Sequence, residues 1–277
     1  MAESLSSDEL PFERGARRAL ELRLTRGLGD EPLVDLWALV RDVGVNLAFH
    51  SFGEDGGDGL YRWNGETALI VANSAMRSRL RQRFTVAHEL GHHELHREGN
   101  SPLLIADTDI LRNRDQPIEQ EANAFAGHLL MPDPAIARAL EEWEVEEITA
   151  PVVARLMQHF GVSYEVSVYR LRNAGRINAG ELDGLLQAKR KVGVRVLCNA
   201  IRFNEFIDYP LPANSLPVSF ESDVLRAYAA RAISDVRLAE LLRLAGPEQA
   251  LERVRAAGIE PQDDELSEDE FEALLDE

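Results

Sequence analysis

The apolar positions of the chain recur at two periods, which separate predicted helices from predicted strands. Spacing of three or four residues is typical of helices with one buried face, and alternation is typical of strands. Helices are predicted over 11–26, 32–43, 84–95, 117–131, 135–144, 149–160 and 164–173, and strands over 45–49, 60–63 and 67–72. The first half of the chain therefore mixes helices with a small sheet.

The predicted strands 60–63 and 67–72 flank Asn64-Gly65, a strong hairpin signal. We expect a small antiparallel sheet beside the helix around residue 90. Strand 69–72 is a candidate edge for holding an extended peptide segment, and an equally good interpretation is that it only packs in the core. Residues 99–115 lack a clear period and are expected to form a loop that gates the site.

Two helices joined by Gly161-Val162-Ser163 give residues 146–178 the outline of a helix-turn-helix unit. Its second helix carries Arg170 and Arg172 but also Glu165, and this thin basic face favours packing or contact with a protein over DNA binding. Further helical periodicity follows residue 218, where Ser234 is an expected N-cap. We expect a linker near Tyr209-Pro210.

These patterns predict an α+β, mostly helical protein: a domain with a small antiparallel sheet, a helix-turn-helix-like unit and a helical C-terminal module. The expected divisions are an N-terminal helix in 1–30, the sheet-containing domain in 31–145, the helix-turn-helix-like unit in 146–178, a helical regulatory or partner-binding module in 180–261 and an acidic tail in 262–277.

Composition narrows the class of protein. The 277 residues contain no run of 18 apolar residues and no leader with a cleavage site, so we expect a cytoplasmic protein without a membrane span. The single cysteine, Cys198, excludes an internal disulfide, and its apolar neighbours favour a buried, inert thiol.

The formal net charge of -18 argues against a nucleic-acid-binding surface. Residues 260–277 hold ten acidic and no basic side chains, which leaves about -8 for the rest. Such a block is usually solvated. Within it, Phe271, Leu274 and Leu275 have helical spacing, so a short docking helix for a basic partner is an alternative.

The segment His88-Glu89-Leu90-Gly91-His92 carries the candidate chemistry. Residues four apart share a helix face, so His88 and His92 can present two imidazole nitrogens to one metal ion. Glu89 then lies beside the metal and can take a proton from a bound water. The alternative is a pair of core histidines satisfied by other partners.

The helix of residues 117–131 can supply a third ligand. Glu119 shares a stripe with Asn123, Ala126 and Leu130, whereas Glu121 lies about 200° around the helix from Glu119. Glu119 is therefore the favoured ligand, and Asn123 could hold a ligating histidine through its other ring nitrogen. Glu121 is expected to pair with a surface arginine.

The stretches Arg81–His96 (RQRFTVAHELGHHELH) and Glu119–Pro132 (EQEANAFAGHLLMP) together resemble the ImmA/IrrE family of zinc endopeptidases. The resemblance runs from about Leu33 to about Ile177 and implies that the domain expected in 31–145 is a zincin-like zinc peptidase domain. It implies that His88, His92 and Glu119 bind Zn2+, with Mn2+ as an alternative in the cell, and that Glu89 is the catalytic base. It also implies that the substrate is a helix-turn-helix repressor whose cleavage relieves repression, in stress or DNA-damage responses, mobile-element control or toxin-antitoxin control.

Other side chains near the motif are candidates for further parts in the chemistry. Tyr169 is the candidate for stabilising the oxyanion, with Tyr164 as an alternative. His93, His96 and His128 are expected at the surface. The rival interpretation of the whole chain is a non-catalytic regulator that binds a repressor or DNA and holds a structural zinc, which would need a fourth protein ligand from His96 or His128.

Overall fold

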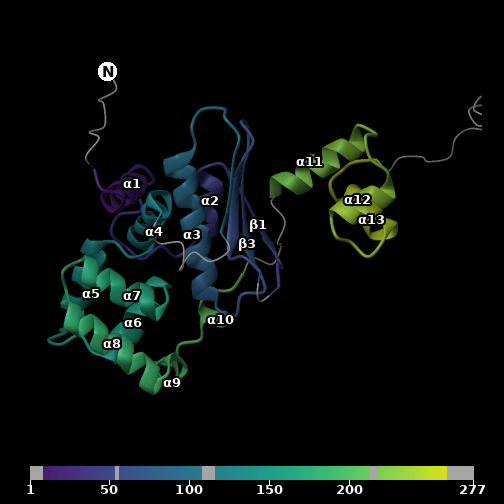
Figure 1. Ribbon diagram of the computed structural model, residues 1–277. Coiled ribbons are helices and arrows are strands. Elements are labelled where there is room, and N and C mark those ends of the chain that lie inside the picture. The colour runs from purple at the N-terminus through teal and green to yellow at the C-terminus, as the bar shows by residue number, and fades with distance from the viewer. Residues whose placement is uncertain (1–8, 54–55, 108–115, 212–217, 261–277) are drawn as a thin grey trace, which may run out of the picture. The chain divides into compact units, whose positions relative to one another are not determined.

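The computed structural model describes residues 9–53, 56–107, 116–211 and 218–260. The chain forms two compact units, residues 1–215 and 216–277, which are treated separately below. The expected acidic tail, with its alternative docking helix, and residues 108–115 of the expected gating loop lie outside the described residues. The described part confirms the α+β, mostly helical class (Figure 1).

The first unit contains the sheet and most of the helices. Its elements are α1 Pro11–Thr25, α2 Leu36–Asp42, β1 Val45–His50, β2 Gly59–Trp63, β3 Ala68–Asn73, α3 Arg79–His96, β4 Leu103–Asp107, α4 Pro117–Leu130, α5 Asp133–Glu142, α6 Ala150–Phe160, α7 Tyr164–Asn173, α8 Ala179–Val192, α9 Val194–Ala200 and α10 Glu205–Asp208.

The sheet has the strand order β1-β3-β2-β4 and is mixed. The antiparallel hairpin of β2 and β3 forms where Asn64-Gly65 predicts it: Oδ1 of Asn64 accepts hydrogen bonds from the backbone N–H groups of Glu66 and Thr67, at 2.9 and 2.7 Å. β1 then adds to β3 in parallel, so the sheet is not antiparallel throughout. This is possible because residues 51–67, which include β2, form a connection long enough for the chain to enter β3 in the same direction as β1.

Strand β3 lies between β1 and β2, and both of its edges are paired. The prediction that residues 69–72 offer an edge to a substrate is therefore wrong, and their core interpretation holds. Residues 103–107, expected to be loop, instead form β4, which pairs with β2. Their apolar run was too short to show a period. In the strand, Leu104 is 66% exposed while its neighbours Leu103 and Ile105 point to the other face and are half-buried.

Helix α3 packs between the sheet and α4, and α4 also packs against α1 (Figure 1). Ser78 caps α3 by accepting from the N–H of Arg81. Glycines allow both helix pairs to approach closely. A Cβ on Gly15 of α1 would lie 2.1 Å from the carbonyl oxygen of Glu121, and one on Gly91 of α3 would lie 3.1 Å from Cα of Ala122.

Helices α6 and α7 enclose the three-residue turn that the sequence predicts, with Gly161 at a φ of +63°. Helices α8 and α9 pack on this pair through buried Leu185 and Leu197. These two helices, which we expected in the C-terminal module, thus belong to the core of the first unit. So does Tyr209 of the expected linker, whose hydroxyl donates to the carbonyl oxygen of Gln158 at 2.7 Å.

Arg83 of α3 is 2% exposed and connects several parts of the first unit. Its guanidinium donates to the carbonyl oxygens of Leu33, at 2.6 Å, and Gly161, at 3.2 Å, and lies over the ring of Tyr209. A buried cation is costly without such partners. Arg83 therefore connects α3 to three segments of the chain: the one before β1, the one after α6 and the one after α10.

The second unit consists of α11 Val218–Ala229, α12 Asp235–Leu241 and α13 Pro247–Ala256. Its own small core contains seven buried side chains: Val224, Tyr228, Leu238, Ala239, Leu242, Ala250 and Val254. Ser234 caps α12, as the sequence predicts.

Across the part of the chain that the structure describes, every helix is too short or too polar to cross a lipid bilayer.

The contact between α1 and α4 predicts the effect of adding one methyl group. Gly15→Ala should lower the free energy of unfolding by about 1–3 kcal/mol, because the methyl group would meet a backbone carbonyl that cannot rotate away. Urea denaturation measures this change. Gly184→Ala is the matched control: that glycine lies in α8 with open space around its Cβ position, so alanine there should be neutral or stabilising. Equal stability of the Gly15→Ala variant and the wild type would contradict the close α1–α4 packing.

Candidate metal centre

The structure brings together the two histidines of the motif and one glutamate of α4. Nε2 of His88 lies 3.0 Å from Nε2 of His92 and 3.2 Å from Oε2 of Glu119, and Nε2 of His92 lies 3.6 Å from Oε1 of Glu119. The histidines are completely buried and Glu119 is 3% exposed. Among the described residues, these three form the one group of metal-binding side chains with mutually adjacent ligand atoms.

The outward-facing nitrogen of His88 has a partner that fixes its protonation. Nδ1 lies 3.2 Å from Oδ1 of Asn123, one turn beyond Glu119 on α4. An amide oxygen only accepts, so Nδ1 carries the proton and Nε2 presents a lone pair toward His92 and Glu119. Asn123 thus orients the ring, as the sequence analysis expected of it.

His92 is oriented by a longer chain of contacts. Its Nδ1 lies 2.8 Å from Nδ1 of His96, and Nε2 of His96 lies 2.9 Å from Oε2 of Glu121. The carboxylate accepts from Nε2–H of His96, so the Nδ1 of neutral His96 accepts from Nδ1–H of His92. Nε2 of His92 therefore also presents a lone pair to the group. Burial lowers the pKa of His96 and favours this neutral form.

Glu121 is held in turn by Arg14 of α1, whose Nη1 lies 3.2 Å from its Oε1. The arginine partner that the sequence predicts for Glu121 is therefore present, although the carboxylate is 6% exposed and not at the surface. His96 is half-buried and turns away from the three ligand atoms. Its expected surface position is wrong, because residues 95–96 still pack beside α1 and α4.

This donor set fits a divalent metal. A tetrahedral zinc site with metal–nitrogen bonds near 2.0–2.1 Å places neighbouring ligand atoms about 3.3 Å apart, which is close to the separations of 3.0, 3.2 and 3.6 Å found here. Two inward-facing lone pairs and a carboxylate in a buried position would repel one another without a cation. Three protein ligands leave a coordination position for water or substrate.

Glu89 is buried next to this group, on the face of α3 that packs against β2. A Cβ on Gly59 of β2 would lie 2.7 Å from Oε1 of Glu89 and 2.7 Å from Cγ2 of Thr85. The missing side chain at the start of β2 therefore makes room for the Glu89 carboxylate. This role of Gly59 could not be predicted from the sequence, because it arises only from the packing of β2 on α3.

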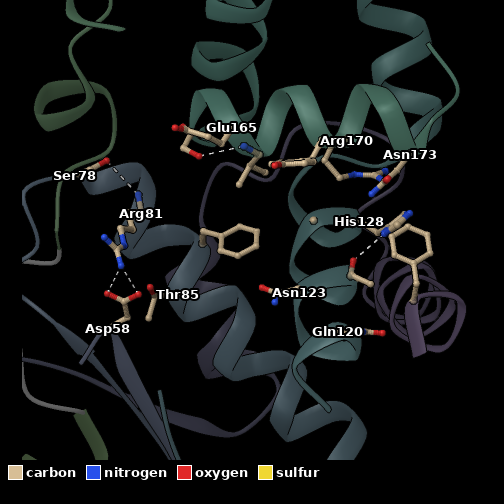
Figure 2. A pocket seen from close by; sticks show the side chains of 17 residues that line it. Asp58, Ser78, Arg81, Thr85, Gln120, Asn123, His128, Glu165, Arg170 and Asn173 are labelled. Carbon is tan, nitrogen blue, oxygen red and sulfur yellow. Dashed lines mark hydrogen bonds and ion pairs between the residues drawn. The ribbon is translucent and has the colours of Figure 1, made fainter. Parts of the chain in front are cut away.

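A cavity of about 610 Å³ lies between α3, α4 and α7 (Figure 2). Thr85 and Asn123 line it, so it begins one helical turn from Glu89 and His88. Figure 2 shows Arg81 and Asp58 bridged on one side of the cavity and His128 and Arg170 on the other. Tyr169 of α7 lines the cavity, whereas the hydroxyl of Tyr164 donates to the carbonyl oxygen of Leu185 at 3.2 Å and is buried away from it.

Two other histidines expected at the surface are buried. His93 is 5% exposed and lies 3.0 Å from the hydroxyl of Tyr61, and His128 is 6% exposed with Nδ1 2.8 Å from the carbonyl oxygen of Ala124. Burial lowers the pKa of each to about 4, so both are neutral at pH 7. The sheet covers the back of α3, which a helical period alone did not reveal.

Cys198 is only half-buried, and burial raises the pKa of its thiol.

Comparison with known proteins gives one family and several relatives. Residues 40–172 match the family model of the IrrE N-terminal-like domain. The chain is 34% identical over 138 residues to the radiation response metalloprotease IrrE of Deinococcus radiodurans, covering 46% of this chain and 37% of that protein. It is 30% identical over 97 residues to the metallopeptidase ImmA of Bacillus subtilis, covering 34% of this chain and 51% of that protein. An uncharacterized immunity region protein of Bacillus phage phi105 is 39% identical over 75 residues, which are 27% of this chain and 45% of that protein. The chain thus spans about half or less of the length of each of these relatives.

The choice between the two glutamates of α4 can be measured. Glu119→Ala should weaken zinc binding by several orders of magnitude, because it removes one of three ligand atoms. Competition with a chromogenic chelator measures the dissociation constant. Glu141→Ala, at an exposed position of α5, is the control and should bind zinc as the wild type does. Loss of zinc in Glu121→Ala but not in Glu119→Ala would overturn the assignment.

The contact between His92 and His96 predicts an indirect effect on the metal. His96→Phe keeps a flat ring but removes the acceptor for Nδ1–H of His92, so zinc affinity should fall roughly 10–100-fold. His159→Phe is the matched control, because His159 packs against Trp143 far along the chain from the metal centre. The same chelator competition applies, and unchanged affinity in His96→Phe would show that His92 needs no such partner.

Proposed function

Through residues 40–172 the chain belongs to the ImmA/IrrE family of metallopeptidases, and from this premise we propose that it is a zinc-dependent endopeptidase that cleaves a helix-turn-helix repressor. The observation that carries the proposal is the buried group of His88, His92 and Glu119 with the carboxylate of Glu89 beside it. Manganese is the alternative metal in the cell.

In this proposal His88, His92 and Glu119 hold the metal, while Asn123 and His96 keep both imidazole lone pairs directed toward it. When bound, the metal supplies a water of lowered pKa and polarises the scissile carbonyl. The protein's own part is to fix the ligands in a dry environment, which strengthens every electrostatic interaction there.

Glu89 acts as the general base and then as the general acid. Its carboxylate takes a proton from the attacking water and delivers it to the nitrogen of the leaving amine. Gly59 supports this role by leaving space for the carboxylate under β2. Tyr169, which lines the adjoining cavity, is our candidate for a hydrogen bond to the oxyanion.

The substrate main chain is proposed to lie along β4. This strand is an edge of the sheet within the described residues, and its partner β2 places Asp107 opposite Gly59, the residue that adjoins Glu89. An extended segment added to β4 would therefore run toward the catalytic carboxylate. Main-chain hydrogen bonds of this kind give affinity with little demand on sequence.

The resemblance to the ImmA/IrrE family, whose members typically cleave helix-turn-helix repressors, supports a repressor as the proposed substrate. The α6–α7 pair and the separate helical unit of residues 218–260 offer surfaces for recognising a folded partner beyond the cleaved bond. Relief of repression in a stress response, a mobile element or a toxin-antitoxin system would be the consequence. We propose that the protein acts in the cytoplasm, where such repressors work.

The rival function, a non-catalytic regulator with a structural zinc, has less support. A closed structural site needs four protein ligands. His96 directs Nδ1 at the outer nitrogen of His92, and His128 directs Nδ1 at a backbone carbonyl, so neither faces the three ligand atoms.

Glu89→Gln tests the peptidase. The variant should bind zinc like the wild type, because Glu89 is not a ligand, and should cleave roughly 10²–10⁴ times more slowly. Zinc-loaded wild type and variant are each mixed with the helix-turn-helix repressor encoded nearest to the protein, and fragments are identified by mass spectrometry. Cutting by Glu89→Gln at the wild-type rate would refute its role as the base. A repressor that both proteins bind and neither cuts would favour the regulator.

A further inference from the structure

We propose that the cavity between α3, α4 and α7 is a specificity pocket that receives a large, uncharged apolar side chain of the cleaved polypeptide. This inference rests on the proposed peptidase function and adds to it a substrate preference.

The cavity begins one helical turn from the metal centre, at Thr85 and Asn123. Contacts of His88 with Asn123 and of His96 with Glu121 show that α3 and α4 run antiparallel. The cavity is lined on α3 by residues that precede His88 and on α4 by residues that follow Glu119: Ser78, Arg81, Phe84, Thr85, Gln120, Asn123, Ala124, Gly127 and His128. The lining residues of both helices therefore lie on the same side of the metal centre, and the cavity runs from there away from the ligand atoms. A side chain next to the scissile bond can enter it at Asn123 and Thr85.

The walls of the cavity are largely apolar. Phe84 of α3 and Ala124 of α4 form one side, Val166 and Tyr169 of α7 form the other, and Phe12 of α1 lies at the end near His128. Phe12 and Tyr169 are 39% and 37% exposed, so their rings are accessible to a ligand in the cavity. A bound apolar side chain would remove both rings from water.

The charged groups around the cavity are balanced within the protein. Arg81 donates to both carboxylate oxygens of Asp58, at 2.8 and 2.6 Å. Arg170 is paired with Asp133, and Glu165 with Lys189. His128 is neutral, since burial lowers its pKa. Among the described residues, the charges that line the cavity have partners of opposite sign, although Nη1 of Arg170 has no hydrogen-bond partner. A charged ligand would lose its hydration here, so an uncharged one fits better.

The size of the cavity agrees with such an occupant. Its volume of about 610 Å³ falls in the range of 300–1,000 Å³ that is usual for ligand sites. It accommodates an aromatic or long aliphatic side chain together with the backbone on either side. An alanine or serine side chain would leave most of the space filled with water against apolar walls.

A larger side chain at position 166 would fill part of the cavity, because Val166 lines it. Val166→Phe adds a ring on the α7 side, while Val166→Ala widens the same place in case the larger residue disturbs folding. Arg172→Phe is the matched control, because it adds the same ring to an exposed position of α7 that does not line the cavity. Thermal unfolding of each variant establishes that it is folded.

The first readout is binding, without any cleavage. Ligand-observed NMR on zinc-loaded Glu89→Gln protein compares N-acetyl-phenylalanine amide, N-acetyl-alanine amide and N-acetyl-glutamate amide. The phenylalanine probe should bind best, its binding should weaken at least about tenfold when Val166→Phe is added, and Arg172→Phe should leave it unchanged. Equal binding of the three probes, or unchanged binding after Val166→Phe, would overturn the pocket.

The second readout is the cleavage pattern of the wild type and the Val166 variants on a library of peptides. One position beside the cut should be rich in Phe, Leu and Met, with smaller residues favoured by Val166→Phe. Cleavage without any such preference would refute the pocket while the peptidase stands. Binding of the phenylalanine probe without cleavage of any peptide or repressor would refute the peptidase while the pocket stands.

Discussion

The close approach of α3 and α4 is the constraint on which the metal centre depends. A histidine pair on one helix needs a third ligand from elsewhere, and Glu119 reaches it only because the two helix backbones nearly touch at Gly91. The side chain that Gly91 lacks would fall against Ala122 and the ring of Phe125. The glycine inside the motif thus acts on the geometry of the metal centre through packing and has no part in the chemistry.

Two separate hydrogen-bond networks hold the imidazoles of His88 and His92 near this contact. Asn123 holds His88 from α4 in one step, whereas His92 is held through His96, Glu121 and Arg14, which extends to α1. The first helix of the chain therefore contributes to the metal centre although it contains no candidate ligand. The apolar cavity begins where the shorter network ends, so Asn123 faces both the metal centre and the proposed pocket.

The sequence predicted those features that depend on periodicity within one element. Spacing of four residues put His88 and His92 on one face, and a shared stripe selected Glu119 over Glu121; the structure brings these three side chains together. Features that depend on contacts between elements were missed. β4 is too short to show alternation, the histidines 93 and 128 are buried by neighbours that their own helices do not reveal, and the space that Gly59 gives to Glu89 arises only when β2 lies over α3.

Residues outside the homologous segment also hold the N-terminal end of α3. Glu205 accepts hydrogen bonds from the Ser78 hydroxyl and the Leu80 N–H, at 2.7 and 3.1 Å, while Arg83 reaches back to Leu33 and out to Tyr209. The match to the family ends at residue 172. The segment shared with the family and the segment needed for packing therefore have different boundaries in this protein. A fragment of residues 40–172 would keep every candidate catalytic residue, but the buried Arg83 guanidinium would lose its contacts with Leu33 and Tyr209.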